Sequence, residues 1–446
     1  DAPPAPPPLI ETLRLSLARH AERAAILWNG AAVTYAQLED TVKRLAPRID
    51  AVERRSGRVG LVLHKGPEMV IGPIAAFWAG RAYVALDATY PEERLAYMAR
   101  HADLDALLCT PETAALAGRL AGDRPVLDLS ELAPSPMHEP AAVQPTDEAY
   151  VLYTSGSTGQ PKGVVQTHGA MAHYVDVYAR RLGLGPEDRL SLFSAFSFDA
   201  AISDTFGAIS TGGAVCPYPI KEKGLEGVPA FIEEAGLTIY HSTPTVLRAL
   251  MDTVDDPQRL RGLRALVLGG EPVLPSDLER FKERFPRGAR FINNLGASEC
   301  SISLWTELDH DTRLRGRMPM GAPVERTRVR LLDDDLRDSF VGQLVVQSDF
   351  LAAGYLHDAE RSARVFGELE GRPAYFSGDI AYARPDGQLV SLGRRDGQVK
   401  VRGNRIELGE VDSAMMEHPR VRRAVASLQP GPDGAPLLVA HVEGDE

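Results

Sequence analysis

A run rich in hydroxyl groups and glycine, with one lysine, has the composition of a loop that binds a polyphosphate. Its members are Thr154, Ser155, Gly156, Ser157, Thr158, Gly159, Lys162 and Gly163. Glycines let backbone N–H groups turn toward an anion, hydroxyls donate hydrogen bonds, and the lysine supplies positive charge. The run is not a Walker A loop, because Pro161 stands where that motif needs its second glycine. Spacing alone favours phosphate binding over a polar surface turn.

The segments that must position this loop predict an α/β fold. The apolar run 149–153 before the loop is typical of a strand, and strand-like and helix-like segments alternate through residues 20–290. Such alternation predicts helices layered on largely parallel sheets. From about Val329 the segments shorten in the manner of antiparallel strands.

We expect three parts along the chain. Residues 1–8 are a Pro-rich linker, typical of an extended spacer in a domain cut from a longer polypeptide or in a trimmed chain. Residues 9–395 form a large N-terminal core of layered α/β sheets with a more antiparallel part toward its end. Residues 396–446 form a small, incomplete α+β C-terminal subdomain with a hairpin at 398–402, a helix at 408–417, and strands at 421–428 and 436–442.

The composition excludes several classes of protein. The chain has 446 residues, of which 44% are hydrophobic and 25% charged, as in soluble globular proteins. A net charge of −12 without a basic stripe argues against nucleic-acid binding. No apolar run reaches the roughly 18 residues of a membrane span. Three scattered cysteines predict neither a disulfide framework nor a metal knuckle, and they favour a cytoplasmic location.

Residues 153–164 resemble, position by position, the phosphate-loop signature of the adenylate-forming superfamily. This superfamily includes acyl-CoA synthetases, luciferases and the adenylation domains of nonribosomal peptide synthetases. Seven further segments resemble adenylation-domain motifs in the family's order: 33–38, 79–84, 87–94, 196–199, 293–299, 375–379 and 393–410. One such motif is weak evidence, whereas eight in order are strong. The resemblance covers roughly residues 20–445 and identifies 9–395 as an adenylation core domain. It implies that this core contains layered α/β sheets plus a distorted β-barrel.

The resemblance implies an amino-acid-activating ligase. Such an enzyme uses ATP and Mg²⁺ to form aminoacyl-AMP, releases pyrophosphate, and passes the acyl group to the phosphopantetheine thiol of a carrier protein. The resemblance leaves open whether the enzyme also binds an MbtH-like partner protein. Two alternatives also stay open: a ligase for another carboxylic acid, such as an acyl-CoA ligase, and a catalytically silent nucleotide-binding module.

The resemblance also implies a nucleotide site. Glu299 and Thr158 would hold Mg²⁺ and act in catalysis with Lys162, although a carboxylate like Glu299 is equally common at a helix start. Asp379 would bind the ribose hydroxyls with help from Arg394, although its Ser-Gly-Asp context also suits a plain turn. The nucleotide-binding residues so implied are Thr154, Ser155, Gly156, Ser157, Thr158, Gly159, Lys162, Gly270, Glu271, Pro272, Asn293, Asn294, Leu295, Gly296, Ser298, Asp379 and Arg394.

Some of these positions bear on the adenine. By the resemblance, Asn293 would bond the adenine amino group, and Gly270, Glu271 and Pro272 would lie against the ring. Leu295 departs from the family, which usually carries a stacking aromatic there. Weaker ATP affinity is the hypothesis that follows.

Asp199 decides the substrate class. A carboxylate between Phe198 and Ala200 is unfavourable to bury without a cationic partner, although it could instead cap the following helix. In the family, the matching aspartate pairs with the α-ammonium of an amino acid. By the same resemblance, Phe198 gates the carboxylate path, although a core phenylalanine is almost as common.

The family's substrate pocket maps onto a mixed set of small and polar residues. These are Asp199, Ala200, Ser203, His241, Val267, Gly269, Asn294, Ile302 and Ser303. The small members leave room, and the polar members favour a polar or medium-sized substrate side chain. His241 could instead be satisfied by Tyr240 or by backbone. The amino acid stays undetermined.

The end of the chain resembles the family's mobile subdomain. By the resemblance, Asp396 is the hinge, and Lys400 and Gly403 approach the active site in the thioester-forming pose. The family also carries a lysine near the end of this subdomain that bridges substrate carboxylate and ATP. The sequence ends at Glu446 before such a motif, so slow adenylation is expected.

Overall fold

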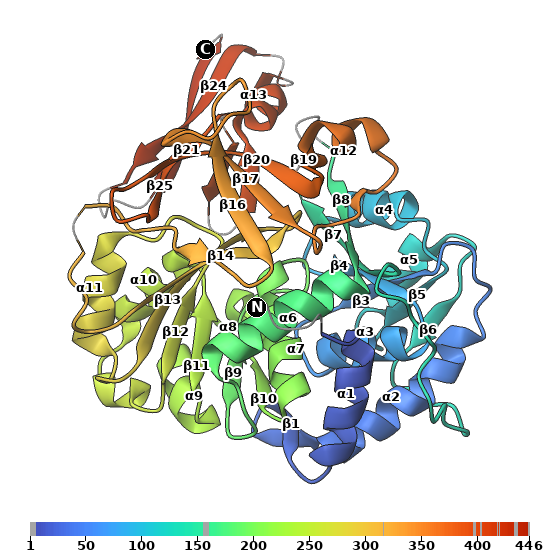
Figure 1. The fold of residues 1–446 in the computed structure, drawn as a ribbon. Coiled ribbons are helices and arrows are strands. Elements are labelled where there is room, and N and C mark those ends of the chain that lie inside the picture. Colours follow the sequence, from blue (N-terminus) through green and yellow to red (C-terminus); the bar gives the residue numbers. More distant parts are fainter. Residues whose placement is uncertain are drawn as a thin grey trace.

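The computed structural model describes residues 6–154, 160–314, 316–395, 398–401, 404–416, 418, 420–431 and 436–444. Two large sheets, with helices between them and on their outer faces, make up most of the described chain (Figure 1). Their strands are short, mostly apolar runs such as Arg58–Leu63 and Ala82–Asp87, in which every residue is buried. Continuous burial is what parallel strands covered on both faces require.

The first sheet has seven strands, and the phosphate-loop sequence follows one of them. Its order is β18 (Gly354–Tyr355), β8 (Lys162–Thr167), β7 (Glu148–Thr154), β4 (Ala82–Asp87), β3 (Arg58–Leu63), β5 (Ala106–Cys109) and β6 (Val126–Asp128). From β7 to β6 neighbouring strands are parallel, whereas β8 and β18 are antiparallel to their neighbours. Helices α4 (Glu92–His101) and α5 (Ala114–Ala121) cover its outer face.

The second sheet has nine strands. Its order is β15 (Ala322–Pro323), β14 (Ser301–Leu308), β13 (Arg290–Ala297), β12 (Ala265–Leu268), β11 (Ile239–Ser242), β9 (Arg189–Leu192), β10 (Ala214–Pro217), β1 (Ala24–Trp28) and β2 (Ala31–Thr34). The strands from β13 to β1 are parallel. Its outer face packs against α8 (Ile220–Lys223), α9 (Val228–Ala235), α10 (Pro244–Thr253), η1 (Pro257–Leu260) and α11 (Pro275–Arg284).

Helices between the two sheets build the main core. They are α1 (Leu9–Arg19), α2 (Tyr35–Asp50), α3 (Glu68–Trp78), α6 (His168–Leu182) and α7 (Asp199–Thr211). Thr34 and Gln37 form a capping box that starts α2, and Thr167 caps α6. Gly183, with φ +60°, ends α6 in the left-handed conformation that glycine adopts without strain.

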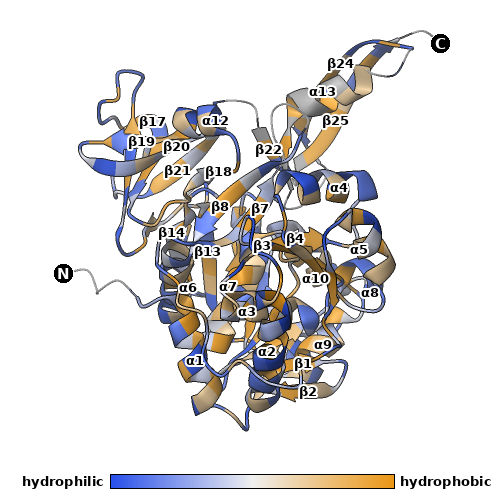
Figure 2. Cartoon of the chain, turned by 90° about the vertical axis from the view of Figure 1, so that its right-hand side faces the viewer, coloured by the Kyte–Doolittle hydropathy of each residue, from blue (hydrophilic) through white to orange (hydrophobic). Residues whose placement is uncertain are grey.

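The remaining described elements are mostly antiparallel, as expected. One sheet orders β16 (Thr327–Leu332), β17 (Val341–Ser348), β20 (Arg372–Ala383) and β19 (Phe366–Leu369), with β21 (Leu389–Arg394) also on β20 and α12 (Ala359–Val365) beside it. Then follow β22 (Gln398–Val401), β23 (Asn404–Glu407), α13 (Leu408–Met416), β24 (Val421–Pro430) and β25 (Pro436–Gly444). The last hairpin and α13 project from the core (Figure 2).

The predicted α/β fold class is confirmed. One detail is corrected: the hairpin expected at 398–402 is the pair β22–β23, which extends to Glu407. The thiols of Cys109, Cys216 and Cys300 are free and buried. Among the described residues, every helix is too short or too polar to cross a lipid bilayer.

Candidate active site

A buried charge cluster lies where the two sheets meet the antiparallel sheet. Glu299 lies in the turn between β13 and β14, so the helix-start alternative is wrong. Its side chain is fully buried, and its Oε1 atom accepts hydrogen bonds from Lys162 Nζ at 3.2 Å and Tyr355 OH at 2.7 Å. Lys162 Nζ also bonds Tyr355 OH at 2.9 Å and lies 4.4 Å from the ring centroid. These contacts neutralise the carboxylate and fix one of its oxygens.

The phosphate loop itself falls largely outside the described residues. This holds for Ser155, Gly156, Ser157, Thr158 and Gly159. Thr154 ends β7, and its buried Oγ1 has no hydrogen-bond partner within the described chain. A buried hydroxyl without a partner is unfavourable, so this atom is available to a ligand.

Asp199 opens α7 and is held by the turn that carries Glu299. The N-cap of α7 is Phe198, without a side-chain cap, so the capping alternative for Asp199 is wrong. Ser298 Oγ donates to Asp199 Oδ2 at 2.9 Å. Asp199 Oδ1 is buried and has no hydrogen-bond partner among the described residues. The carboxylate therefore lacks one partner.

The charge state of Asp199 reflects this environment. Burial raises its pKa to about 6, although the hydrogen bond from Ser298 partly offsets the rise. The nearby charge of Glu299 also raises the pKa, and that of Lys400 on β22 lowers it. A cationic ligand at Oδ1 would favour the ionised form and lower this pKa.

Two further side chains position the loops beside Asp199, and no sequence pattern singled them out. Gln166 on β8 donates from Nε2 to the carbonyl of Ser298 at 2.7 Å. Lys65 donates to the carbonyls of Leu192 at 3.2 Å, Phe193, and Ser194 at 2.8 Å. Lys65 thereby holds the segment between β9 and α7, and burial lowers its pKa to about 7.

The predicted pocket residues come from α7 and four neighbouring strands. Ala200 and Ser203 lie on α7, His241 on β11, Val267 on β12, Asn294 on β13, and Ile302 and Ser303 on β14. Gly269 follows β12, and a Cβ atom there would lie 2.3 Å from Asn294 Oδ1. Only glycine therefore lets the Asn294 side chain lie against this strand.

The partner of His241 differs from both alternatives. His241 Nδ1 lies 2.8 Å from Asp204 Oδ1 and 3.4 Å from Tyr178 OH. The hydroxyl of Tyr240 has no hydrogen-bond partner within the described residues. His241 is therefore paired with a carboxylate on α7, which was not predicted from the sequence.

The proposed ribose-binding pair is built into a sheet rather than a turn. Asp379 lies within β20 opposite Arg394 of β21, which corrects the turn alternative. Arg394 Nη1 lies 3.3 Å from Asp379 Oδ1 and donates to the carbonyl of Ser377 at 2.9 Å. Ser377 Oγ accepts from the Asp379 N–H at 3.0 Å. The carboxylate is thus held in a defined orientation.

The residues expected near adenine have identifiable structural partners. Asn293 Nδ2 donates to the carbonyl of Pro319 at 2.9 Å, so the amide oxygen is the end that can accept. Glu271 Oε2 accepts from the N–H of Thr245 at 3.0 Å and from its hydroxyl at 2.6 Å. Its side chain thus supports the start of α10. Leu295 is partly buried against the core of the antiparallel sheet.

The hinge prediction lies mostly outside the described residues, since Asp396 and Gly403 are not among them. Lys400 is described, and its charge lowers the pKa of Asp199. The neighbouring Arg395 pairs with Asp334 on the surface.

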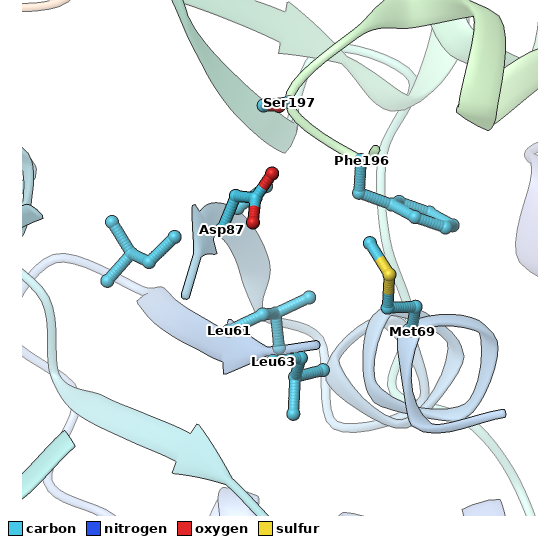
Figure 3. A pocket seen from close by; sticks show the side chains of 8 residues that line it. Leu61, Leu63, Met69, Asp87, Phe196 and Ser197 are labelled. Carbon is cyan, nitrogen blue, oxygen red and sulfur yellow. The ribbon is translucent and has the colours of Figure 1, made fainter. Parts of the chain in front are cut away.

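A small cavity lies beside the segment that leads to Asp199 (Figure 3). Its wall is Leu61, Leu63, Met69, Ala85, Leu86, Asp87, Phe196 and Ser197. Asp87 already accepts hydrogen bonds from the Thr89 N–H and hydroxyl at 3.0 and 2.7 Å. We interpret this mostly apolar cavity as a packing gap rather than a nucleotide site.

Within the described chain, no three His, Cys, Asp or Glu side chains converge as a metal cluster would require. Any divalent ion at Glu299 would therefore need ligands from other groups, such as hydroxyls or a bound phosphate.

Comparisons with known proteins agree with this arrangement. A family model described as AMP-binding enzyme matches residues 13–356. The dimodular nonribosomal peptide synthase of Bacillus subtilis (strain 168) is 33% identical over 444 residues, which cover 95% of this chain and 18% of that protein. Tyrocidine synthase 1 of Brevibacillus parabrevis is 30% identical over 437 residues, which cover 94% of this chain and 39% of that protein. The chain thus spans less than half the length of each of these synthases.

Two similar solved structures are nonribosomal peptide synthetases. FmoA3 (S1046A) in its α-methyl-L-serine-AMP bound form has a TM-score of 0.82 and 30% identity, covering 89% of this chain and 46% of that one. Holo-PA1221, which contains adenylation and PCP domains bound to a vinylsulfonamide inhibitor, has a TM-score of 0.84 and 26% identity. The match to holo-PA1221 covers 99% of this chain and 77% of that one.

Proposed function

Because this chain belongs to the AMP-binding enzyme family, we propose that it activates an amino acid as aminoacyl-AMP. In this reaction a carboxylate oxygen attacks the α-phosphorus of ATP, the bond to the β-phosphate breaks, and pyrophosphate leaves. The observation that carries the proposal is the buried Oδ1 of Asp199, which has no partner among the described residues. An α-ammonium group would supply the missing donor and the missing positive charge.

The same carboxylate favours an amino acid over a simple carboxylic acid. An acyl substrate without an ammonium would leave Asp199 buried and unpaired, which is costly. Ser298 fixes Oδ2 at 2.9 Å, so Oδ1 is oriented before the substrate arrives. Such preorganisation would place the substrate carboxylate reproducibly beside the nucleotide.

Glu299 fits the role of a Mg²⁺ ligand. Its carboxylate is a hard oxygen donor, fully buried, two residues from β14 and beside the end of the phosphate loop. Thr158 would assist it. When bound, the ion would offset the charge on the phosphates. Lys162, which now pairs with Glu299, would lie close enough to contribute positive charge toward a phosphate oxygen.

The nucleoside would be held by residues from two sheets. Asp379, oriented by Arg394, would accept the ribose hydroxyls, and the Asn293 amide oxygen would accept from the adenine amino group. Leu295 would contact the base through an aliphatic side chain. Binding at both ends would hold the reacting atoms in line, which is the main requirement of this chemistry.

We extend the proposal to a second step, transfer of the aminoacyl group to the phosphopantetheine thiol of a carrier protein. The thiol sulfur would attack the acyl carbon of aminoacyl-AMP, and AMP would leave. Support comes from the similarity to PA1221, in which an adenylation domain is joined to a PCP domain. The charge of Lys400 near Asp199 is consistent with a C-terminal unit that reaches the site.

The test is ATP–pyrophosphate exchange with a panel of amino acids and, in parallel, carboxylic acids that lack an amino group. Exchange that requires an amino acid supports the proposal. Exchange with the carboxylic acids alone would identify an acyl ligase instead. ATP binding without any exchange would identify a silent nucleotide-binding module.

A further inference from the structure

One face of β8 holds the turn that carries Glu299 at two successive residues. Lys162 and Gln166 lie four residues apart on this strand, so their side chains leave the same face of the sheet. Lys162 Nζ lies 3.2 Å from the carboxylate of Glu299, and Gln166 Nε2 donates to the carbonyl of Ser298 at 2.7 Å. One strand thus fixes both the candidate metal ligand and the residue before it.

The hydrogen bond from Gln166 constrains the central peptide group of a β-turn. The N–H of Cys300 donates to the carbonyl of Ala297 at 2.9 Å, so Ser298 and Glu299 are the two central residues of this turn. The peptide group between two such residues can rotate while the turn stays closed, and its two orientations distinguish type I from type II turns. Gln166 therefore selects one orientation of the Ser298 carbonyl.

The orientation of Ser298 matters because its hydroxyl binds Asp199. Ser298 Oγ donates to Asp199 Oδ2 at 2.9 Å, and within the described residues it is the one hydrogen-bond donor to that carboxylate. Tyr174 OH donates to the main-chain carbonyl of Asp199 at 3.0 Å, which holds the backbone rather than the side chain. The direction of Asp199 Oδ1 therefore depends on Ser298, and through Ser298 on Gln166.

Burial makes the bond from Gln166 difficult to replace. Gln166 is 1% exposed and lies directly opposite Tyr150 on β7, which in turn lies opposite Tyr83 on β4. The two tyrosine rings are fully buried and stack with their centroids 5.6 Å apart. An apolar side chain at position 166 would leave the Ser298 carbonyl against a group that cannot donate, which favours rotation of the central peptide group.

We propose that Gln166 is a positioning residue of the amino-acid site, which orients through Ser298 the carboxylate that receives the α-ammonium group. This inference rests on the proposed adenylation and deepens it. Glu299 keeps its own contacts, because its carboxylate accepts from Tyr355 OH at 2.7 Å and its carbonyl accepts from the N–H of Ala352 at 2.9 Å. Loss of the Gln166 donor therefore weakens the amino-acid side of the site more than the nucleotide side.

The experiment measures, by calorimetry, the binding of glycyl-sulfamoyl adenosine and acetyl-sulfamoyl adenosine. These non-hydrolysable analogues differ only in the α-ammonium group, so the ratio of their dissociation constants reports the contact with Asp199 whichever side chain the pocket prefers. The parent protein is expected to bind the glycyl analogue about tenfold or more tightly than the acetyl analogue. Gln166→Met, which keeps the side-chain length and removes the donor, should reduce this ratio about threefold or more.

The matched control is Gln347→Met. Gln347 on β17 is 2% exposed and likewise donates from Nε2 to a main-chain carbonyl, that of Leu369, at 2.8 Å. Its replacement should lower stability by a similar amount and leave the ratio unchanged, because a general loss of stability weakens the binding of both analogues equally. Gln166→Val, which suits a β-strand, gives the same test if the methionine variant does not fold.

A double-mutant cycle tests the route from Gln166 to Asp199. Ser298→Ala removes the hydroxyl that binds the carboxylate and should lower the ratio by itself. Adding Gln166→Met to Ser298→Ala should then lower the ratio no further, because Gln166 acts through that hydroxyl.

Two sets of outcomes contradict different claims. A ratio that Gln166→Met leaves unchanged, a ratio that falls equally in Gln347→Met, or effects of Gln166→Met and Ser298→Ala that multiply would overturn the inference alone. Equal binding of the two analogues by the parent protein, or failure of both to bind together with no pyrophosphate exchange, would overturn the proposed function and this inference together.

Discussion

Replacing Asp199 by asparagine should stabilise the ligand-free protein at neutral pH while abolishing amino-acid activation. Burial raises the pKa of Asp199 from 3.8 to about 6. The folded state therefore binds this proton more tightly than the unfolded state. The resulting stability is complete below about pH 4 and is lost as the pH rises through 6. The difference between the folded-state and unfolded-state pKa values corresponds to a loss of about 3 kcal/mol in the free energy of unfolding at pH 7 and above.

The measurement is urea denaturation of the parent and Asp199→Asn proteins between pH 4 and 8. The free energy of unfolding of the variant should exceed that of the parent by up to about 3 kcal/mol at pH 7 to 8, and by almost nothing at pH 4. Asp188→Asn is the matched control. Burial alone would raise the pKa of Asp188, but hydrogen bonds from Arg264 and Thr238 outweigh it and hold that pKa below its usual value.

The control should therefore respond with the opposite sign. Removal of the Asp188 charge should destabilise the protein at pH 7, and the loss should shrink as the pH falls below 4. In the exchange assay, Asp199→Asn should reduce kcat/KM for the amino acid by at least two orders of magnitude, as expected from loss of a buried charge partner worth about 3–5 kcal/mol. A variant no more stable than its parent at pH 7, or one that retains exchange, would refute the reasoning.

Three further predictions concern the nucleotide side of the site. Tyr355→Phe removes the 2.7 Å bond to Glu299 Oε1 and should raise the Mg²⁺ concentration for half-maximal exchange severalfold; an unchanged Mg²⁺ titration would contradict it. Lys162→Met removes one ion pair of the buried Glu299 carboxylate and should lower the free energy of unfolding by about 3–5 kcal/mol, measured in urea. Glu299→Gln in the same chain should recover most of that loss, and no recovery would mean that the pair is not coupled. Leu295→Tyr should lower the KM for ATP about two- to tenfold through ring stacking, and a KM equal to that of the parent would show that stacking is not limiting.

Much of the fold follows from patterns that act over short distances. Apolar runs such as 59–63 predict strands buried on both faces, and the structure confirms this. The family predicted from eight ordered motifs is also confirmed. The order of strands was not predicted, because pairings such as β18 with β8 join segments far apart in the chain and leave no local pattern.

The candidate site likewise contains residues that local motifs indicate and residues that only long-range contacts reveal. Asp199, Glu299 and Asp379 could be singled out from the sequence because their motifs are local, and the structure contradicts the alternative structural role of each. Tyr355 and Asp204 were missed because their importance arises only when distant elements bring them to Glu299 and His241. The one available signal for Asp204 was a second aspartate inside the helix that begins at Asp199, since such a residue is rarely buried without a partner.

The influence of Lys400 on Asp199 has a thermodynamic consequence. A substrate ammonium bound to Asp199 would lie near the charge of Lys400, and because the two cations repel each other, each would weaken the attraction of the other to this site. Linkage makes this effect reciprocal. Binding of the amino acid would weaken the interaction between Lys400 and Asp199, and movement of Lys400 away from Asp199 would strengthen binding of the amino acid. Occupancy of the amino-acid site and the position of β22 would therefore depend on each other through these charges.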